Sequence, residues 1–161
     1  MIDLQSEKRR IRIAKEHYDL PYEFYSKMLG TEGVYTSALF EPEEREKCEM
    51  VVLEKAQERK LQRVVEWLGL TEKDSVLDVG CGYGGLLRHI HKTTGAQVTG
   101  LSNSIGHIET ARMLSQKAGI PIAFIHDDYT KMKGRYSAVT SVEMIESVGA
   151  RHLMEYFALL H

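Results

Sequence analysis

Short apolar runs alternate with amphipathic stretches from residue 75 onward. The runs at 75–79, 97–101, 122–125 and 138–142 predict buried strands. The segments after the first, second and fourth runs carry apolar residues at three- and four-residue spacing, which predicts helices. Because strand and helix alternate in short units, we expect an α/β fold with a doubly wound parallel sheet and right-handed crossovers.

The expected helices have recognisable ends. The helix after the first run stops near Gly95, and Ser104 is a candidate N-cap for a helix that ends at Gly119. Before the sheet, residues 43–69 predict a long helix with one apolar stripe, for which Gly69 is a suitable stop.

The first 42 residues differ in character from the rest. Residues 3–16 predict a polar, basic helix, whereas residues 17–42 contain half of the 8 Tyr and 4 Phe residues. Within that aromatic stretch we expect a short helix from Tyr22 to Leu29. We interpret residues 1–42 as a helical, aromatic lid segment and residues 43–161 as a Rossmann-like domain. A second small core is the alternative explanation for the aromatic residues.

The charge of the chain limits the classes of partner that it is expected to bind. The formal net charge of -2 provides no overall attraction to nucleic acid, so no nucleic-acid partner is expected. A basic cluster near the N-terminus predicts either a solvated helix face or a patch that contacts anionic lipid headgroups. The cluster consists of Lys8, Arg9, Arg10, Arg12 and Lys15.

Two further features of the sequence indicate the cellular compartment of the protein. The sequence shows no apolar stretch with the pattern of a signal peptide or the length of a membrane span. Its two cysteines, Cys48 and Cys81, have no spacing typical of a metal site or a disulfide framework. We therefore expect a cytoplasmic protein without a metal, with peripheral membrane contact as a further option.

A glycine turn, Gly80-x-Gly82-x-Gly84, lies between the first expected strand and the helix that follows it. Glycines at such a turn let the backbone approach a ligand, and the helix start offers free N–H groups. Dinucleotide-binding folds use a related turn with the spacing G-x-G-x-x-G and place an acid after the second strand. This chain has Leu101–Ser104 there, so the pattern favours S-adenosylmethionine over NAD.

Acidic residues follow the third and fourth expected strands, at the sheet edge where ligands bind. Asp127 and Asp128 come after the third, and a carboxylate there could accept the adenine amino group. We favour Asp128, although a helix cap or a solvated loop is the alternative. Glu143 and Glu146 follow the fourth strand. Glu146 is the better candidate for a functional acid, and a surface carboxylate at a helix start is an equally good interpretation of its spacing.

The residues as a whole resemble the cyclopropane-fatty-acyl-phospholipid synthases, with their mycolic acid and lipid C-methyltransferase relatives. The resemblance implies a class I methyltransferase fold, S-adenosyl-L-methionine as cofactor, and C-methylation of unsaturated fatty acyl chains of lipids to give a cyclopropane or a methyl branch. A small-molecule or amine acceptor, or a truncated non-catalytic cofactor-binding paralogue, are the alternatives. The matching segments are 17–20 with 24–25, 34–41, 56–57 with Lys60, 76–85, 98–104, 128–129, 141–146 and 148–149.

The resemblance assigns roles to individual residues. It implies that Tyr35 and Thr36 contact the methionine end of the cofactor. Ser102 and His107 are expected near the ribose, and Asp128 near the adenine. The full set of expected cofactor-binding residues is Tyr35, Thr36, Gly80, Gly82, Gly84, Ser102, Ser104, His107, Asp128 and Tyr129.

Catalytic roles follow from the same resemblance. The family uses a bicarbonate ion as base, and Glu146 is expected to help hold it, with Ser37 and Tyr35 as further catalytic candidates. Many relatives have cysteine at the position of Ser37 and histidine at that of Ser147, so ring closure is in question here. His107 stands where glutamine is usual, a change with less effect on cofactor binding.

Length is the largest departure from the family. Strands five to seven of the family's sheet have no counterpart in these 161 residues. We therefore expect the fourth strand to be an exposed edge. A fragment of a longer enzyme, a truncated gene product, or pairing of this edge with a second copy would each explain it.

Overall fold

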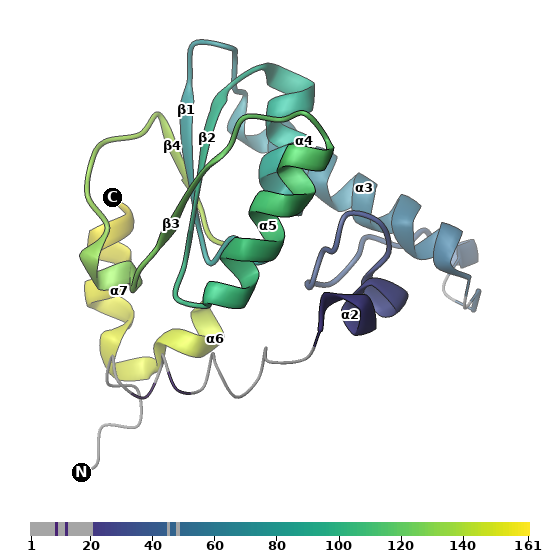
Figure 1. Cartoon of the computed structure of the whole chain (residues 1–161), viewed down its shortest axis with the longest axis horizontal. Coiled ribbons are helices and arrows are strands. Elements are labelled where there is room, and N and C mark those ends of the chain that lie inside the picture. The colour runs from purple at the N-terminus through teal and green to yellow at the C-terminus, as the bar shows by residue number, and fades with distance from the viewer. Residues whose placement is uncertain (1–8, 10–11, 13–20, 45, 48) are drawn as a thin grey trace.

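The computed structural model describes residues 9, 12, 21–44, 46, 47 and 49–161 (Figure 1). A parallel sheet with the strand order β3-β2-β1-β4 forms its centre. The predicted α/β class is therefore confirmed. The strands are β1 (Ser75–Val79), β2 (Gln97–Ser102), β3 (Ala123–His126) and β4 (Ala138–Thr140).

Helices cover both faces of the sheet (Figure 1). One face packs against α3 (Met50–Leu68), α4 (Gly85–Thr94) and α5 (Ile105–Lys117), and the other against α7 (Leu153–Leu160). The shorter elements are α2 (Tyr22–Leu29), α6 (Ile145–Val148) and the 3-10 turns η1 (Pro42–Glu44), η2 (Tyr129–Lys131) and η3 (Ala150–His152). None of these described helices combines the length and the apolar composition that a bilayer span requires.

Strand β1 contributes to two hydrophobic clusters. Val76 packs into the cluster on the α3, α4 and α5 face, whereas Leu77 and Val79 pack with Tyr129 and Tyr156 on the opposite face. A parallel sheet covered on both faces needs apolar residues on both sides of each strand. This explains why the sequence of β1 is a nearly continuous apolar run.

Local signals predicted most element ends correctly. The helix Tyr22–Leu29 is present as α2, and Gly95 ends α4 in the left-handed conformation. The hydroxyl of Ser104 accepts the backbone N–H of His107 at 3.2 Å, so the predicted N-cap is confirmed.

Two elements are shorter than predicted. Helix α3 begins at Met50 rather than near residue 43, and Pro42–Glu44 form the separate turn η1. The segment before that turn lies beside α3, where the backbone N–H of Leu39 donates to the carbonyl of Ala56 at 3.0 Å. Strand β4 ends at Thr140, and the hydroxyl of Ser141 already donates to the carbonyl of Val79.

The expected basic helix at 3–16 lies outside the described residues, apart from Arg9 and Arg12, which are helical. The family-like segment 17–20 also lies outside them. The division of the chain at residue 42 stays a prediction.

A buried arginine joins the N-terminal segment to the sheet domain. The guanidinium of Arg88, on α4, donates to the carbonyls of Tyr83 and Glu32, each at 2.7 Å, and pairs with the Glu32 carboxylate at 2.9 Å. Burial alone would raise the pKa of Glu32, but Arg88 and Lys92 hold that pKa below its usual value. The loop after α2 is thereby fixed against α4.

Candidate cofactor site

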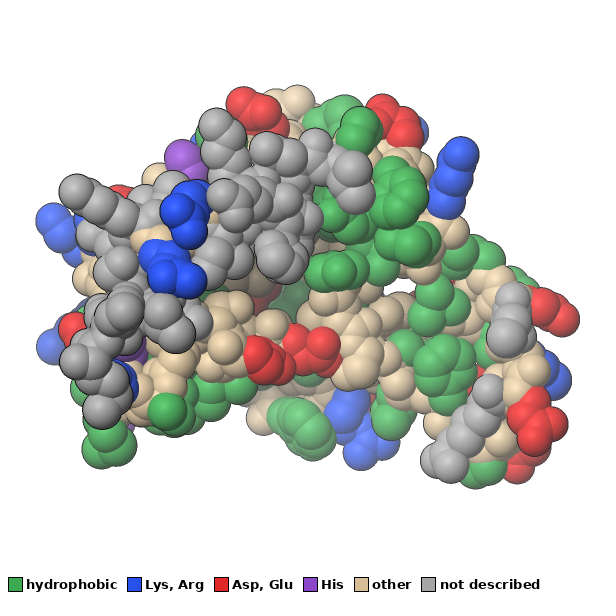
Figure 2. All heavy atoms as spheres, turned by 90° about the horizontal axis from the view of Figure 1, so that it is seen from below, with side chains coloured by type: hydrophobic (Ala, Val, Ile, Leu, Met, Phe, Trp, Pro, Cys, Tyr) green, Lys and Arg blue, Asp and Glu red, His purple; other side chains and the backbone are tan. Residues whose placement is uncertain are grey.

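A pocket of about 530 Å³ opens at the carboxyl ends of β1, β2 and β4. Figure 2 views this end of the molecule and shows a hollow with acidic and hydrophobic side chains beside it. Its volume lies in the range of about 300–1,000 Å³ typical of small-molecule sites. The predicted site residues that line it are Tyr35, Thr36, Gly80, Gly82, Ser102, His107, Tyr129 and Glu146.

Each glycine of the turn has its own structural reason. Gly80, Gly82 and Gly84 all have positive φ, of 83°, 51° and 77°. A Cβ on Gly80 would lie 2.6 Å from the sulfur of Met144, whereas a Cβ on Gly82 would meet no protein atom within 4 Å. Gly82 therefore faces the open pocket. Gly84 is the N-cap of α4 and packs near Phe124, so it shapes the turn without lining the pocket.

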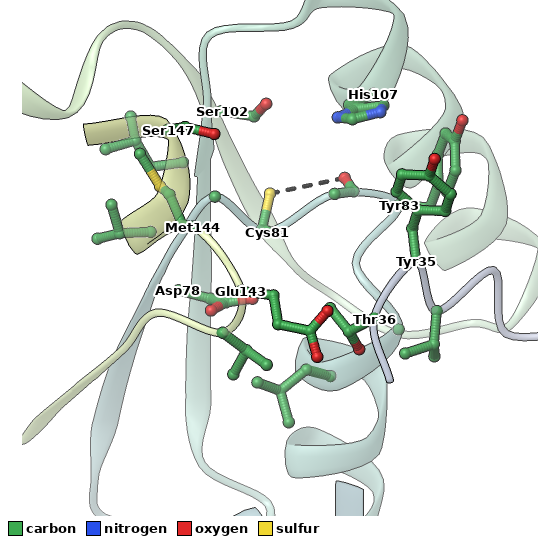
Figure 3. Close-up of a pocket in the computed structure, with 18 of the residues that line it drawn as sticks. Tyr35, Thr36, Asp78, Cys81, Tyr83, Ser102, His107, Glu143, Met144 and Ser147 are labelled. Carbon is green, nitrogen blue, oxygen red and sulfur yellow. Dashed lines mark hydrogen bonds between the residues drawn. The ribbon is translucent and has the colours of Figure 1, made fainter. Parts of the chain in front are cut away.

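Aromatic side chains form one wall of the pocket (Figure 3). The ring of Tyr83 lies 4.7 Å from that of His107 and 6.0 Å from that of Tyr25, which in turn lies 5.8 Å from Tyr35. Burial lowers the pKa of His107 to about 4, so its ring is neutral at neutral pH. This wall joins residues of the N-terminal segment to residues of the glycine turn and α5.

Tyr35 and Thr36 line the pocket, whereas Ser37 lies next to them in the chain and is not part of the lining. Gln57 donates to the carbonyl of Thr36 at 2.8 Å, and the amino group of Lys60 donates to the Thr36 hydroxyl. The backbone N–H of Ser37 donates to a carboxylate oxygen of Glu143 at 2.8 Å, and its hydroxyl donates to the same atom.

Two charged residues of the site, Asp78 and Lys60, received no role from the sequence. Asp78 is buried and accepts the hydroxyl of Thr140 at 2.8 Å. Burial raises the pKa of Asp78 to about 6, although the Thr140 hydrogen bond and Lys60 oppose the shift. Burial lowers the pKa of Lys60, against the attraction of Glu143 and Asp78. Two features of the sequence could have singled these residues out. Asp78 is an acid inside a predicted buried strand, and Lys60 belongs to a segment that resembles the family.

The two aspartates after β3 are placed differently. Asp127 lines the pocket, whereas Asp128 is 2 % exposed and its carboxylate accepts the backbone N–H and the hydroxyl of Thr130. Asp128 thus caps η2. Its expected contact with adenine stays a prediction, and Asp127 is the aspartate of the pair on the wall.

Comparisons with known proteins identify the family of the chain. The sequence model of the mycolic acid cyclopropane synthetase family matches residues 5–161. Sphingolipid C9-methyltransferase 2 of Gibberella zeae is 37% identical over 155 residues, which cover 91% of this chain and 29% of that protein. The cyclopropane-fatty-acyl-phospholipid synthase of Escherichia coli K12 is 32% identical over 161 residues, which cover 99% of this chain and 40% of that protein.

A solved structure shows the same fold. The mycolic acid cyclopropane synthase CmaA1, complexed with SAH and CTAB, has a TM-score of 0.82 at 24% identity, over 94% of this chain and 52% of that one. The present chain thus spans 29% to 40% of the length of these two curated relatives. Because the family match extends over nearly the whole sequence, the chain belongs to the mycolic acid cyclopropane synthetase family of S-adenosylmethionine-dependent methyltransferases.

Proposed function

We propose that this chain forms the cofactor site of a C-methyltransferase that acts on a carbon–carbon double bond in an unsaturated lipid chain. The observation that carries the proposal is a pocket that joins the glycine turn to an aromatic wall. The names of the curated relatives, which refer to sphingolipids and fatty acyl phospholipids, support a lipid acceptor.

The residues present fit S-adenosylmethionine. Gly82 leaves one side of the turn open, and a Cβ there would project into ligand space. Ser102 and His107 would hold the nucleoside part, and the neutral ring of His107 can take part in hydrogen bonds without adding charge. When bound, the cofactor supplies an electrophilic methyl group.

The chain's own residues would then stabilise and deprotonate the lipid. Positive charge on the methylated chain would lie near the faces of Tyr35 and Tyr83, which line the pocket, while Tyr25 packs behind them. A desolvated cation–π contact contributes about 2 kcal/mol. Glu146 also lines the pocket and is the proposed carboxylate near the departing proton.

The arrangement does not fit bicarbonate at Ser37. Both the N–H and the hydroxyl of Ser37 donate to Glu143, so the donors that an anion would need are engaged. Glu146 adds a further carboxylate to the same pocket. We derive no step through this ion.

A labelled methyl donor tests the reaction. The chain is incubated with S-adenosylmethionine carrying a fully deuterated methyl group and with vesicles of unsaturated or fully saturated phospholipid. We expect labelled lipid only from the unsaturated vesicles, detected by mass spectrometry. Loss of one deuterium indicates that the proton leaves from the transferred methyl group, as in ring closure or methylene formation, and retention of all three indicates that it leaves from a chain carbon, which gives a methyl-branched alkene. Label on a saturated lipid's amine headgroup would contradict the proposal and support N-methylation.

Cofactor affinity should depend on pH through Asp78, which lines the pocket. Because the folded-state pKa is raised to about 6, the protonated form predominates below that pH and the ionised form above it. A cationic ligand favours the ionised form, so we expect about tenfold weaker binding at pH 5 than at pH 7, in proportion to the ionised fraction. Calorimetric titration at several pH values measures this.

The matched variant for that experiment is Asp78→Asn, whose affinity should show a flatter pH profile. The raised pKa of Asp78 also makes the stability of the chain depend on pH. The folded state binds the proton more tightly, so the free energy of unfolding falls as pH rises from about 4 to 6. If the affinity of Asp78→Asn depends on pH as steeply as that of the wild-type chain, another group causes the pH dependence of binding.

Two partner proposals extend the function to assemblies. Contact with an anionic membrane surface is supported by the basic cluster at residues 8–15, of which Arg12 is exposed. Self-association is supported by β4, which pairs with β1 at an edge of the described sheet.

A further inference from the structure

The segment Tyr35–Ser37 is held from two sides of the pocket. From α3, Gln57 and Lys60 donate to the carbonyl and the hydroxyl of Thr36. From the loop after β4, Glu143 accepts both polar hydrogens of Ser37, 106 residues away in the sequence. Figure 3 shows the Glu143 side chain extending toward Thr36 beside the pocket. The Glu143–Ser37 pair therefore links the N-terminal segment to the loop that follows the edge strand β4.

The backbone of Glu143 is strained. Its φ is 51°, and among the described residues it is the non-glycine residue with a positive φ. Side chains with a Cβ disfavour this region, whereas glycine adopts it freely. Strained residues of this kind concentrate at functional sites, where a specific side chain is needed. The backbone at position 143 would suit glycine, so the structure retains glutamate there against the local conformational preference.

The contacts of the Glu143 side chain explain why glutamate stands at a position whose backbone would suit glycine. Its carboxylate accepts two hydrogen bonds from Ser37, and hydrogen bonds to an ionised acceptor are stronger than neutral ones. The two residues beside Ser37, Tyr35 and Thr36, both line the pocket. A displacement of Ser37 would therefore move the pocket wall.

We propose that Glu143 is a positioning residue: through Ser37, its carboxylate holds Tyr35 and Thr36 at the positions where they contact the cofactor. This inference rests on the proposed function only in its choice of ligand. Glu143 itself lines the pocket, and the proposal assigns its effect to the segment that it holds rather than to contact with the reacting atoms. Its substitution should therefore change ligand affinity more than stability.

Two substitutions separate the carboxylate from the strained backbone. Glu143→Gly removes the carboxylate and releases the strain, whereas Glu143→Gln keeps the length and one acceptor oxygen but not the charge. We expect the affinity of Glu143→Gly for S-adenosylhomocysteine, measured by titration calorimetry, to fall about tenfold, which corresponds to about 1.4 kcal/mol. Its Tm should stay within about 2 °C of the wild-type value, because the lost bonds and the released strain offset each other. Glu143→Gln should lie between the two. Wild-type affinity in Glu143→Gly would overturn the proposal.

Hydrogen exchange of the Ser37 amide tests the positioning role without any ligand. Loss of the acceptor in Glu143→Gly should make this amide exchange roughly tenfold faster by NMR. Glu146→Gln is the matched control, because it removes a carboxylate from the same pocket but not the one that accepts from Ser37. Its Ser37 amide should exchange at the wild-type rate.

The two measurements distinguish this proposal from the proposed function. If the wild-type chain does not bind S-adenosylhomocysteine, the proposed cofactor site fails for this chain, and the exchange result alone decides the role of Glu143. Faster exchange in Glu143→Gly then supports positioning, and unchanged exchange overturns it. If the wild-type chain binds and Glu143→Gly binds with the same affinity as the wild type, the cofactor site stands and the positioning role does not.

Discussion

Replacing Gly82 with valine should reduce the affinity for S-adenosylmethionine at least a hundredfold, which corresponds to about 2.7 kcal/mol. Gly82 has a φ of 51° and lines the pocket, and its added Cβ would meet no protein atom within 4 Å. The valine side chain would therefore occupy the space of the ligand rather than clash with the protein. Calorimetric titration of the variant against the wild-type chain measures the loss.

The strain of the positive φ must be separated from the loss of ligand space. Gly119 provides the matched control, since its φ is 69°, its added Cβ would also meet nothing within 4 Å, and it lies beyond the end of α5 and outside the pocket. Gly119→Val should lower the Tm by a similar amount to Gly82→Val but keep wild-type affinity. Equal affinities in the two variants would show that the cofactor does not lie over the glycine turn.

Replacing Arg88 with alanine should destabilise the chain by about 3 kcal/mol, because it removes a buried donor whose hydrogen bonds, being charge-assisted, contribute about 1.5–3 kcal/mol each. The Arg88 side chain is 3 % exposed and serves the carbonyls of Tyr83 and Glu32 as well as the Glu32 carboxylate. Its removal takes this donor from both carbonyls, leaves Lys92 as the cation beside the Glu32 carboxylate, and opens a cavity. For a domain of this size we expect the Tm to fall by roughly 6–12 °C. Thermal unfolding followed by circular dichroism measures the change.

An exposed arginine controls for the loss of a charge alone. Arg63 pairs with Glu66 at 3.6 Å on the surface of α3, with both side chains more than half exposed. Arg63→Ala should change the free energy of unfolding by about 0.5 kcal/mol or less. If both variants unfold at the same temperature, the contacts of Arg88 do not hold the N-terminal segment in place.

Acidification should remove the same contact reversibly. The pKa of Glu32 is held below its usual value by Arg88 and Lys92, so its stabilising contribution is present at neutral pH. It is lost as pH falls through that lowered pKa, because the protonated carboxyl no longer pairs with the guanidinium. The stability difference between the wild-type chain and Glu32→Gln should therefore shrink in acid.

The sequence by itself determined the elements that depend on neighbouring residues. The apolar runs predicted the strands, Ser104 predicted a helix start, and the spacing of Gly80, Gly82 and Gly84 predicted a turn, of which Gly80 and Gly82 line the pocket. Periodicity, capping and turn conformation are properties of a few consecutive residues, so they can be recognised without knowledge of the packing. The family resemblance added Tyr35 and Thr36, which line the pocket although they lie far from the turn in sequence.

Tertiary structure decided the contacts between distant residues and the electrostatics that follow from burial. The pairs Ser37–Glu143 and Glu32–Arg88 are 106 and 56 residues apart, and no local pattern indicates either. Burial sets the raised pKa of Asp78, and the path of the chain after β3 places Asp127 rather than Asp128 on the pocket wall. Such features depend on how whole elements pack against one another, because a side chain's partners and its access to water exist only once those elements are assembled.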